Sequence, residues 1–336
     1  MSDPLQRIPE WDGVDARTFR EDIVTRYRPA VLRGLVRDWP AVRHAVQSID
    51  AICQYLGRFD SGRAVDVVIT PPHVRGRMFY NDDFSGFNFA RSTLSISAVN
   101  DKLRRYAAFD HRPSIAAQSA LIADCLPGFA EENRLPLLDE SVRPRIWLGS
   151  AFVTPAHFDE SSNIACVVAG RRRFTLFPPE QIANLYIGPL DFAPTGTPIS
   201  LVSVREPDFD RFPRFRDALA AAQVADLEPG DAVYIPPLWF HHVESLAKYN
   251  LLVNYWWGRM GKADSALNCL LHALVALKDL APEQRRAWAA IFDHYVFAAD
   301  GEAARHIPAA KRGVLGPISP ELAAQVRRFL VSQLQG

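Results

Sequence analysis

The chain has 336 residues, of which 48% are hydrophobic and 23% charged, as is ordinary for a soluble globular protein. Lys plus Arg and Asp plus Glu number 38 each, so the net charge of zero gives no electrostatic reason to expect nucleic acid or an anionic membrane as a partner. The four cysteines form no CxxC pair, and neither a signal peptide nor a long apolar run is visible, so we expect a cytoplasmic protein without a disulfide framework or a membrane segment.

Residues 1–145 mix short helical and extended patterns, for example a helix over Asp15–Tyr27 and a strand over Ala30–Leu35. We interpret this part as an α/β flank that packs on the following region. Residues 146–258 form mostly short strands bounded by Pro and Gly, which suggests a sandwich or a jelly roll. The predicted strands are Arg145–Gly149, Asn163–Val168, Arg173–Phe177, Ala232–Ile235, His242–Glu244 and Leu251–Trp256.

Residues 259–336 change to helical periodicity. Three apolar stripes occur at helical spacing, and the helix with the third stripe is predicted to begin with Ser319 as its cap and Pro320 in its first turn. The stripes must be buried somewhere, either on the sheet or against a second subunit, so a homodimer through these helices is one expectation. The stripes are Leu267, Leu270, Leu271 and Leu274; Trp288, Ile291, Phe292 and Tyr295; and Leu322, Val326, Phe329 and Leu330.

The main chemical signal is a His-x-Asp pair at the entry to a strand, His157 and Asp159. In an extended chain residues i and i+2 point to the same side, so both side chains can face one ion. About 80 residues later, a Gly-Asp turn and an apolar strand lead to His241. Two imidazoles and one carboxylate that leave other coordination positions open are the ligand set of non-haem Fe(II) oxygenases.

A His-x-Asp motif alone is weak, since His242-Val-Glu244 has a similar pattern in the same chain. Most histidines pack or lie at the surface. The motif indicates a metal site only because it lies at the entry to a predicted strand and because His241 follows a second predicted strand about 80 residues later. The adjacent His242 has the opposite strand parity, so we expect it to face away from the ion and to act in packing or as a neighbour of the ligands.

Several longer segments resemble the JmjC-type, cupin-like (cupin-8) family of Fe(II)- and 2-oxoglutarate-dependent oxygenases. Within that family, they most resemble the asparaginyl hydroxylase that inhibits hypoxia-inducible factor. The resemblance implies a double-stranded β-helix (jelly-roll) core with helical flanks, and it covers residues from about 28 to about 258. The segments are RPAVLRGLVRDWPA (28–41), TPAHFDESSN (154–163), GRRRFTLFPPEQ (170–181), REPDFDRFPRF (205–215), GDAVYIPPLWFHHVESL (230–246) and VNYWW (253–257).

The resemblance assigns His157, Asp159 and His241 as iron ligands. It also places a basic residue 15 positions after the first ligand, which is Arg172 here, where close relatives often have Lys. A guanidinium can hold the distal carboxylate of 2-oxoglutarate in two hydrogen bonds, although Arg172 is also one of three consecutive arginines and could be solvated. Thr154 matches the hydroxyl that assists it.

Tyr106 is a second candidate hydroxyl, on approximate spacing only. Asn163 and Asn254 match the polar pair of the family's pocket, with local backbone hydrogen bonds as the alternative role. Trp256 shares strand parity with Asn254, so Trp256 is predicted to line the substrate side together with Trp239, although aromatics on strands are more often plain core.

The function implied is an Fe(II) oxygenase that uses 2-oxoglutarate and dioxygen to hydroxylate a side chain of a peptide or protein. A small metabolite is an alternative substrate. The rival hypotheses are a cupin-fold metalloenzyme without a 2-oxo acid and a non-catalytic metal-binding module. The long span Tyr186–Leu227 and the aromatic segment Arg77–Arg91 are predicted to border the substrate site.

Overall fold

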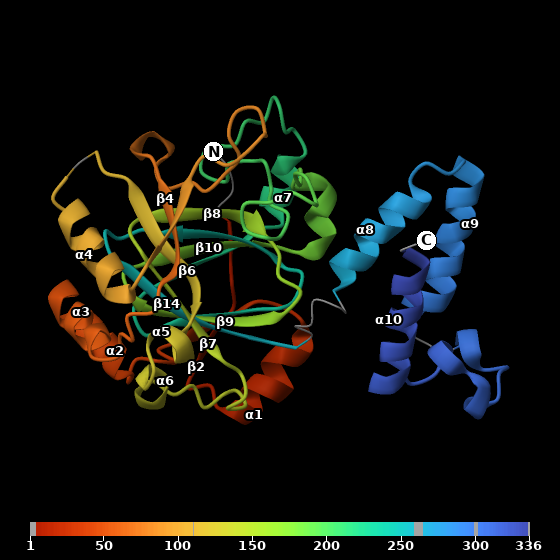
Figure 1. The fold of residues 1–336 in the computed structure, drawn as a ribbon, viewed down its shortest axis with the longest axis horizontal. Coiled ribbons are helices and arrows are strands. Elements are labelled where there is room, and N and C mark those ends of the chain that lie inside the picture. The colour runs from red at the N-terminus through yellow and green to blue at the C-terminus, as the bar shows by residue number, and fades with distance from the viewer. Residues whose placement is uncertain (1–4, 110, 259–264, 299–301, 335–336) are drawn as a thin grey trace. The chain divides into compact units, whose positions relative to one another are not determined.

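Fourteen strands in two sheets form the centre of residues 1–265. The computed structural model describes residues 5–109, 111–258, 265–298 and 302–334. Contacts between residues divide the chain into two units (Figure 1). Residues 1–265 contain all the strands described, and the elements described in residues 266–336 are helical. The predicted N-terminal flank and the predicted strand region therefore lie in one unit.

The strands of each sheet come from distant parts of the chain. The five-stranded sheet has the order β1 (Gln6–Arg7), β11 (Gln223–Leu227), β10 (Arg172–Phe177), β13 (Phe240–Ser245) and β8 (Phe152–His157). The nine-stranded sheet has the order β2 (Glu10–Asp12), β3 (Ala30–Arg33), β12 (Ala232–Ile235), β9 (Ser162–Ala169), β14 (Asn250–Trp257), β7 (Pro144–Gly149), β6 (Ser114–Leu121), β4 (Val65–Thr70) and β5 (Ala90–Leu94).

Strands β7 to β14 form a jelly roll, because the chain passes from one sheet to the other at almost every connection, with β10 and β11 as the exception. The inner faces of both sheets are apolar and pack against each other, with Val167 of β9, Phe174 of β10 and Val233 of β12 in one buried cluster. The predicted double-stranded β-helix is confirmed.

Helices pack on the outer face of the nine-stranded sheet, where they bury the largest apolar cluster of the protein. These are α2 (Pro40–Gln47), α3 (Ile49–Gly57) and α4 (Ile96–Tyr106), with the shorter α5 (Ile122–Cys125) and α6 (Phe129–Glu132) (Figure 1). The predicted N-terminal helix is present as α1 (Ala16–Thr18) followed by a π-helical turn over Phe19–Ile23. Helix α7 (Phe215–Ala220) packs in a separate cluster with Phe177 and Phe240.

The second unit holds the three predicted C-terminal helices, α8 (Ala266–Leu277), α9 (Pro282–Phe292) and α10 (Pro320–Leu334). Ser319 caps α10 as expected, since its Oγ accepts a hydrogen bond of 3.2 Å from the backbone N–H of Leu322. None of the described helices is both long enough and apolar enough to cross a membrane.

The structure adds elements that the sequence patterns did not indicate. Strands β4, β5 and β6 extend the nine-stranded sheet from the N-terminal region, and the long span Tyr186–Leu227 contains α7 and β11. The strand predicted over Ala30–Leu35 ends at Arg33, because Gly34 has a φ of +60° and turns the chain.

Gly149, at the end of β7, allows the backbone of β6 to come close. A Cβ atom at this position would lie 2.5 Å from the carbonyl oxygen of Ile115 and 2.9 Å from the Cα of Ala116. Backbone cannot move as a side chain can, so we expect Gly149→Ala to lower the free energy of unfolding by about 1–3 kcal/mol in urea titrations. Gly57→Ala is the matched control, because nothing lies within 4 Å of its Cβ position. Equal stability of the two variants would contradict this close approach.

Candidate metal centre and its pocket

A β-bulge in β8 sets the direction of the first candidate ligand. Strands β8 and β13 are antiparallel neighbours in which His157 pairs with His241 and Thr154 pairs with Val243. Three steps along β8 therefore oppose two steps along β13, so β8 carries one extra residue. This extra residue lets both Thr154 and His157 line the same cavity, although strict alternation would point them to opposite sides.

His157, Asp159 and His241 lie together, with one potential ligand atom from each residue within 4.8 Å of the others. The Nε2 atom of His241 is 3.6 Å from Oδ2 of Asp159, and the two imidazole rings have centroids 4.2 Å apart. Asp159 follows the end of β8, and its carbonyl oxygen accepts a hydrogen bond of 2.8 Å from the N–H of Leu238. This bond ties the carboxylate-bearing segment to the turn before β13.

The donor atoms of this group suit a divalent metal ion. In each histidine Nδ1 lies at hydrogen-bond distance from a backbone carbonyl, of Pro155 at 2.8 Å and of Trp239 at 3.1 Å. Carbonyls only accept, so Nδ1 carries the proton and the lone pair is on Nε2. Burial lowers the pKa of His241 to about 4, which keeps it neutral near pH 7.

Asp159 completes the fit. Its Oδ2 atom is buried and has no hydrogen-bond partner among the described residues. Burying a carboxylate oxygen in this way is costly unless a bound cation stabilises it. Two imidazole nitrogens and one carboxylate oxygen are also the donor set that Fe(II) takes in non-haem oxygenases. The residues present therefore fit an iron ion.

A cavity of about 280 Å³ adjoins the three side chains, inside the jelly roll. Most residues predicted for the pocket line it, and they come from both sheets: Thr154, Asn163, Arg172, Asn254 and Trp256. Their positions follow strand alternation, since Asn254 and Trp256 of β14 share a face, as do Arg172 and Phe174 of β10.

Arg172 carries a charge into this cavity without a counter-charge. The residue is 8% exposed, its Nε atom has no hydrogen-bond partner, and it makes no ion pair with the described residues. Burial lowers its pKa to about 10, so the guanidinium stays protonated near pH 7. A buried guanidinium without a partner is unfavourable, and an anion bound in the cavity would relieve this cost.

Two amides and two indoles form another part of the wall. Trp147 donates a hydrogen bond of 2.9 Å from Nε1 to Oδ1 of Asn254, and Asn254 in turn donates one of 3.4 Å to Oδ1 of Asn163. Trp256 contacts Trp147 edge to face, and its buried Nε1 atom has no hydrogen-bond partner among the residues that the structure describes. Trp147 was not predicted, although it alternates with Ile146 and Leu148 in a predicted strand.

Two predicted pocket residues lie elsewhere. Tyr106 is the last residue of α4 and packs against the large cluster between the helices and the nine-stranded sheet. Trp239 is buried in the cluster between the two sheets, and its Nε1 donates a hydrogen bond of 3.2 Å to the carbonyl of Tyr27. Neither residue is among those that line the metal-side cavity. Approximate spacing could not place Tyr106, because the packing of α4 decides the direction of its side chain. The direction of Trp239 depends on the turn at Leu238, which has a φ of +64°.

His242 points to the other side of β13, as its parity predicts, and lines a different cavity. Its Nε2 atom is 3.4 Å from Oε1 of Glu244, which also pairs with Arg205. Burial alone would raise the pKa of Glu244, but the hydrogen bonding and charge of His242 and Arg205 outweigh it and lower this pKa to about 2.

The lowered pKa of Glu244 makes a prediction for stability. A carboxylate whose pKa falls on folding stabilises the protein above its unfolded pKa and loses this effect as the pH falls towards the folded value. We expect Glu244→Gln to lower the free energy of unfolding at pH 7 by about 1–3 kcal/mol and by progressively less below about pH 4.5. Urea titrations at several pH values measure this, with the exposed Glu228→Gln as control. A difference that is independent of pH would contradict the assignment.

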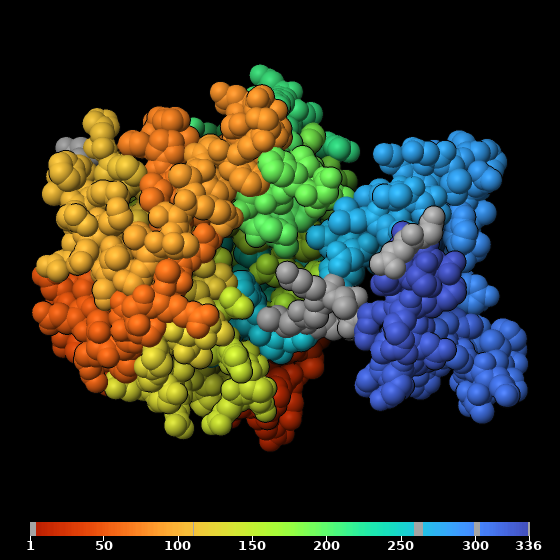
Figure 2. Space-filling model, viewed as in Figure 1, coloured from red at the N-terminus to blue at the C-terminus, as the bar shows by residue number. Residues whose placement is uncertain are grey.

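The rim of the cavity comes from two segments of low regularity. Met78 and Arg91 of the aromatic segment line it, and so do Pro194 and Thr195 of the long span before α7. The segments are joined by a hydrogen bond from Arg91 to the carbonyl of Pro194 and by stacked rings of Phe87 and Phe192 at 4.7 Å. Figure 2 shows them, in orange and green, side by side on the surface.

Comparison with known proteins gives one family and several relatives. Residues 16–262 match the family model described as a cupin-like domain. A tRNA wybutosine-synthesizing protein 5 of Gallus gallus is 26% identical over 326 residues, 85% of this chain and 93% of the relative. The HSPB1-associated protein 1 of Homo sapiens is 33% identical over 293 residues, 80% of this chain and 56% of the relative. A lysine-specific demethylase 8 of Danio rerio is 26% identical over 264 residues, 76% of this chain and 59% of the relative.

Proposed function

Since the chain belongs to the cupin-like, JmjC-related family of 2-oxoglutarate oxygenases, we propose that it is an Fe(II)- and 2-oxoglutarate-dependent hydroxylase of a peptide or protein side chain. Members of this family use Fe(II) and 2-oxoglutarate, and the His157, Asp159 and His241 group is consistent with iron binding. The closer resemblance to an asparaginyl hydroxylase stays a prediction.

The observation that carries the proposal is the position of Arg172 in the same cavity as the three metal-site side chains. His157, Asp159 and His241 would hold Fe(II) through two Nε2 atoms and a carboxylate oxygen. Arg172 would bind the distal carboxylate of 2-oxoglutarate, with the hydroxyl of Thr154 beside it. When bound, Fe(II) with 2-oxoglutarate and dioxygen supplies the oxidant, and 2-oxoglutarate leaves as succinate and CO2.

The protein's other contribution is to position the substrate and limit water. Asn254 is held by Trp147 and is therefore oriented before any ligand enters. The rim formed by the segments around Arg91 and Pro194 borders the same cavity, where a substrate side chain would enter. A peptide substrate is consistent with relatives named as lysine-specific demethylases. A small metabolite is the second candidate, because the cavity itself holds only about 280 Å³.

Turnover of the co-substrate tests the proposal. Purified protein is incubated with Fe(II), ascorbate and 2-oxoglutarate, and succinate is measured with and without candidate substrates. We expect succinate above the level of a His157→Ala variant, and a mass increase of one oxygen atom in the true substrate. Metal binding without succinate and without 2-oxoglutarate binding would instead favour a non-catalytic module or a cupin enzyme of another kind.

The substrate class needs its own comparison. Peptide libraries, small carboxylic acids and modified tRNA are offered in parallel, the last because of the relative named as a tRNA wybutosine-synthesizing protein. Only a true substrate should increase succinate formation and gain oxygen in equal amounts. Oxygen incorporation into a small acid or a tRNA nucleoside, with none into peptides, would contradict the peptide proposal and leave the oxygenase intact.

We also propose a homodimer formed by the C-terminal helices. Several large apolar side chains of α8, α9 and α10 are exposed within the described chain, including Leu270 at 46%, Trp288 at 41% and Phe329 at 61%. Surfaces of this kind suit association. Size-exclusion chromatography with light scattering should show about twice the 37.6 kDa mass of the chain, and Phe329→Glu should shift it to the monomer. A monomer at every concentration would contradict this proposal.

A further inference from the structure

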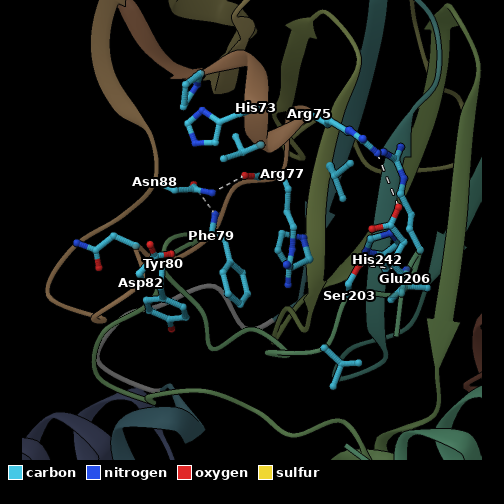
Figure 3. Close-up of a pocket in the computed structure, with 18 residues that line it drawn as sticks. His73, Arg75, Arg77, Phe79, Tyr80, Asp82, Asn88, Ser203, Glu206 and His242 are labelled. Carbon is cyan, nitrogen blue, oxygen red and sulfur yellow. Dashed lines mark hydrogen bonds and ion pairs between the residues drawn. The ribbon is translucent and has the colours of Figure 1, made fainter. Parts of the chain in front are cut away.

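We propose that a second cavity, on the other side of β8 and β13 from the metal centre, binds a small organic carboxylate through Arg77. The cavity measures about 970 Å³, at the upper end of the roughly 300–1,000 Å³ typical of ligand pockets. It is bordered by residues 71–88 and 202–206, with β8 and β13 as its floor (Figure 3).

The two cavities share two strands but have no lining residue in common. In β8, Val153 and Pro155 face the second cavity, whereas Thr154 and His157 face the metal side. In β13, His242 faces the second cavity and its neighbour His241 the metal side. The second cavity is thus a separate site.

The charges around the second cavity leave one half-buried cation, Arg77, without a counter-charge among the described residues. Arg75 pairs with Glu206 at 3.8 Å, and Arg205 pairs with Glu244. Arg77 has no carboxylate partner among the described residues. The one hydrogen bond that its guanidinium makes with the described residues runs from Nη2 to the carbonyl of Leu201, at 3.3 Å.

Arg77 is also held in place by an aromatic ring. Its guanidinium carbon lies 3.8 Å from the ring centroid of Phe79, and Figure 3 shows both side chains extending together into the hollow. Burial lowers the pKa of Arg77, as it does for Arg172 on the metal side. In both cavities, therefore, a partly or fully desolvated guanidinium would be stabilised by an anion. The aspartate of this cavity, Asp82, is exposed and lies beside Tyr80 in Figure 3, away from Arg77.

The floor supplies a second polar group. His242 is 3% exposed and faces the cavity; its Nε2 atom lies 3.4 Å from Oε1 of Glu244, whereas its Nδ1 atom has no hydrogen-bond partner among the described residues. A ligand oxygen would satisfy a group of this kind. The rest of the wall is mixed, and Val74, Val153 and Val202 supply apolar surface among polar residues such as Asn88 and Ser203. A cation, a buried imidazole and this apolar surface together suit a carboxylate that carries an apolar body, rather than a bare inorganic anion.

Fluorine NMR of 4-fluorobenzoate added to the full-length protein tests this site. We expect saturable binding, weakened at least about tenfold in Arg77→Gln, because the charged partner of the carboxylate is lost. The Arg172→Gln variant distinguishes the two cavities and should leave binding within about twofold, as should the exposed Arg28→Gln. Val74→Trp, which adds bulk to the lining of the cavity and leaves Arg77 intact, should weaken binding and guards against misfolding of Arg77→Gln as the cause of a loss.

The proposal is overturned by three outcomes: no saturable binding to the native protein, binding that is unchanged in both Arg77→Gln and Val74→Trp, or binding lost in Arg172→Gln. Unlabelled benzoate and inorganic phosphate are compared as competitors. Displacement by benzoate but not by phosphate supports an organic carboxylate site, whereas equal displacement by both would overturn that specificity. None of these readouts depends on oxygenase activity.

Discussion

Replacing Asp159 with alanine is expected to reduce 2-oxoglutarate turnover by at least about 100-fold. Loss of a residue that only hydrogen-bonds to a metal ligand already costs up to about 100-fold, and loss of a ligand should cost at least as much. Asp159 supplies the one carboxylate of the group, and its buried Oδ2 has no hydrogen-bond partner in the described chain. Two neutral imidazoles alone would not balance the charge of a divalent ion.

Metal content and succinate formation are measured on the same preparations. Elemental analysis should show about one iron per chain in the native protein and far less in Asp159→Ala and His157→Ala. The exposed His111→Ala is the histidine control and should retain both properties. Circular dichroism checks that each variant is folded. Undiminished turnover in a folded Asp159→Ala variant would show that this group is not the catalytic metal site.

Replacing Arg172 with glutamine is expected to raise the KM for 2-oxoglutarate by at least about 30-fold, as follows from the loss of a buried charge pair with its ligand. The effect on kcat at saturating 2-oxoglutarate should be much smaller, because Arg172 would contact the end of the co-substrate away from the metal. Arg172→Lys keeps the charge, so its KM for 2-oxoglutarate should lie between the KM of the native protein and that of Arg172→Gln.

A stability measurement separates ligand binding from a structural role of Arg172. Since its guanidinium is buried without a counter-charge, Arg172→Gln should not destabilise the ligand-free protein in urea titrations. The neighbouring Arg171, whose side chain is 61% exposed, provides the matched control, and Arg171→Gln should leave KM unchanged. A native KM in Arg172→Gln would remove the case for a 2-oxo acid in this cavity.

Local sequence patterns predicted those helices and strands whose structure depends mainly on residues close by in the sequence. Helical periodicity identified α8, α9 and α10, and the predicted strand Ala232–Ile235 matches β12. The motif at His157 and the distant His241 lie together because the jelly roll brings β8 and β13 side by side.

Other features depend on tertiary contacts that no local pattern carries. Strands β4, β5 and β6 were missed because the nine-stranded sheet is completed by segments far apart in the sequence. The bulge in β8 is equally hidden, and without it strand alternation would have separated Thr154 from His157. Tyr106 was wrongly placed by spacing, since the packing of α4 decides where its side chain lies.

The hydrogen bond from Leu238 to the carbonyl of Asp159 has a consequence for how the ion is captured. This bond couples the backbone of Asp159 to the turn that precedes His241, and the pairing of β8 with β13 places His157 beside His241. Folding of the chain thus brings the three donors together, and binding of an ion would cost little further conformational entropy. Most of its coordination energy remains as affinity, because little is lost to ordering the protein.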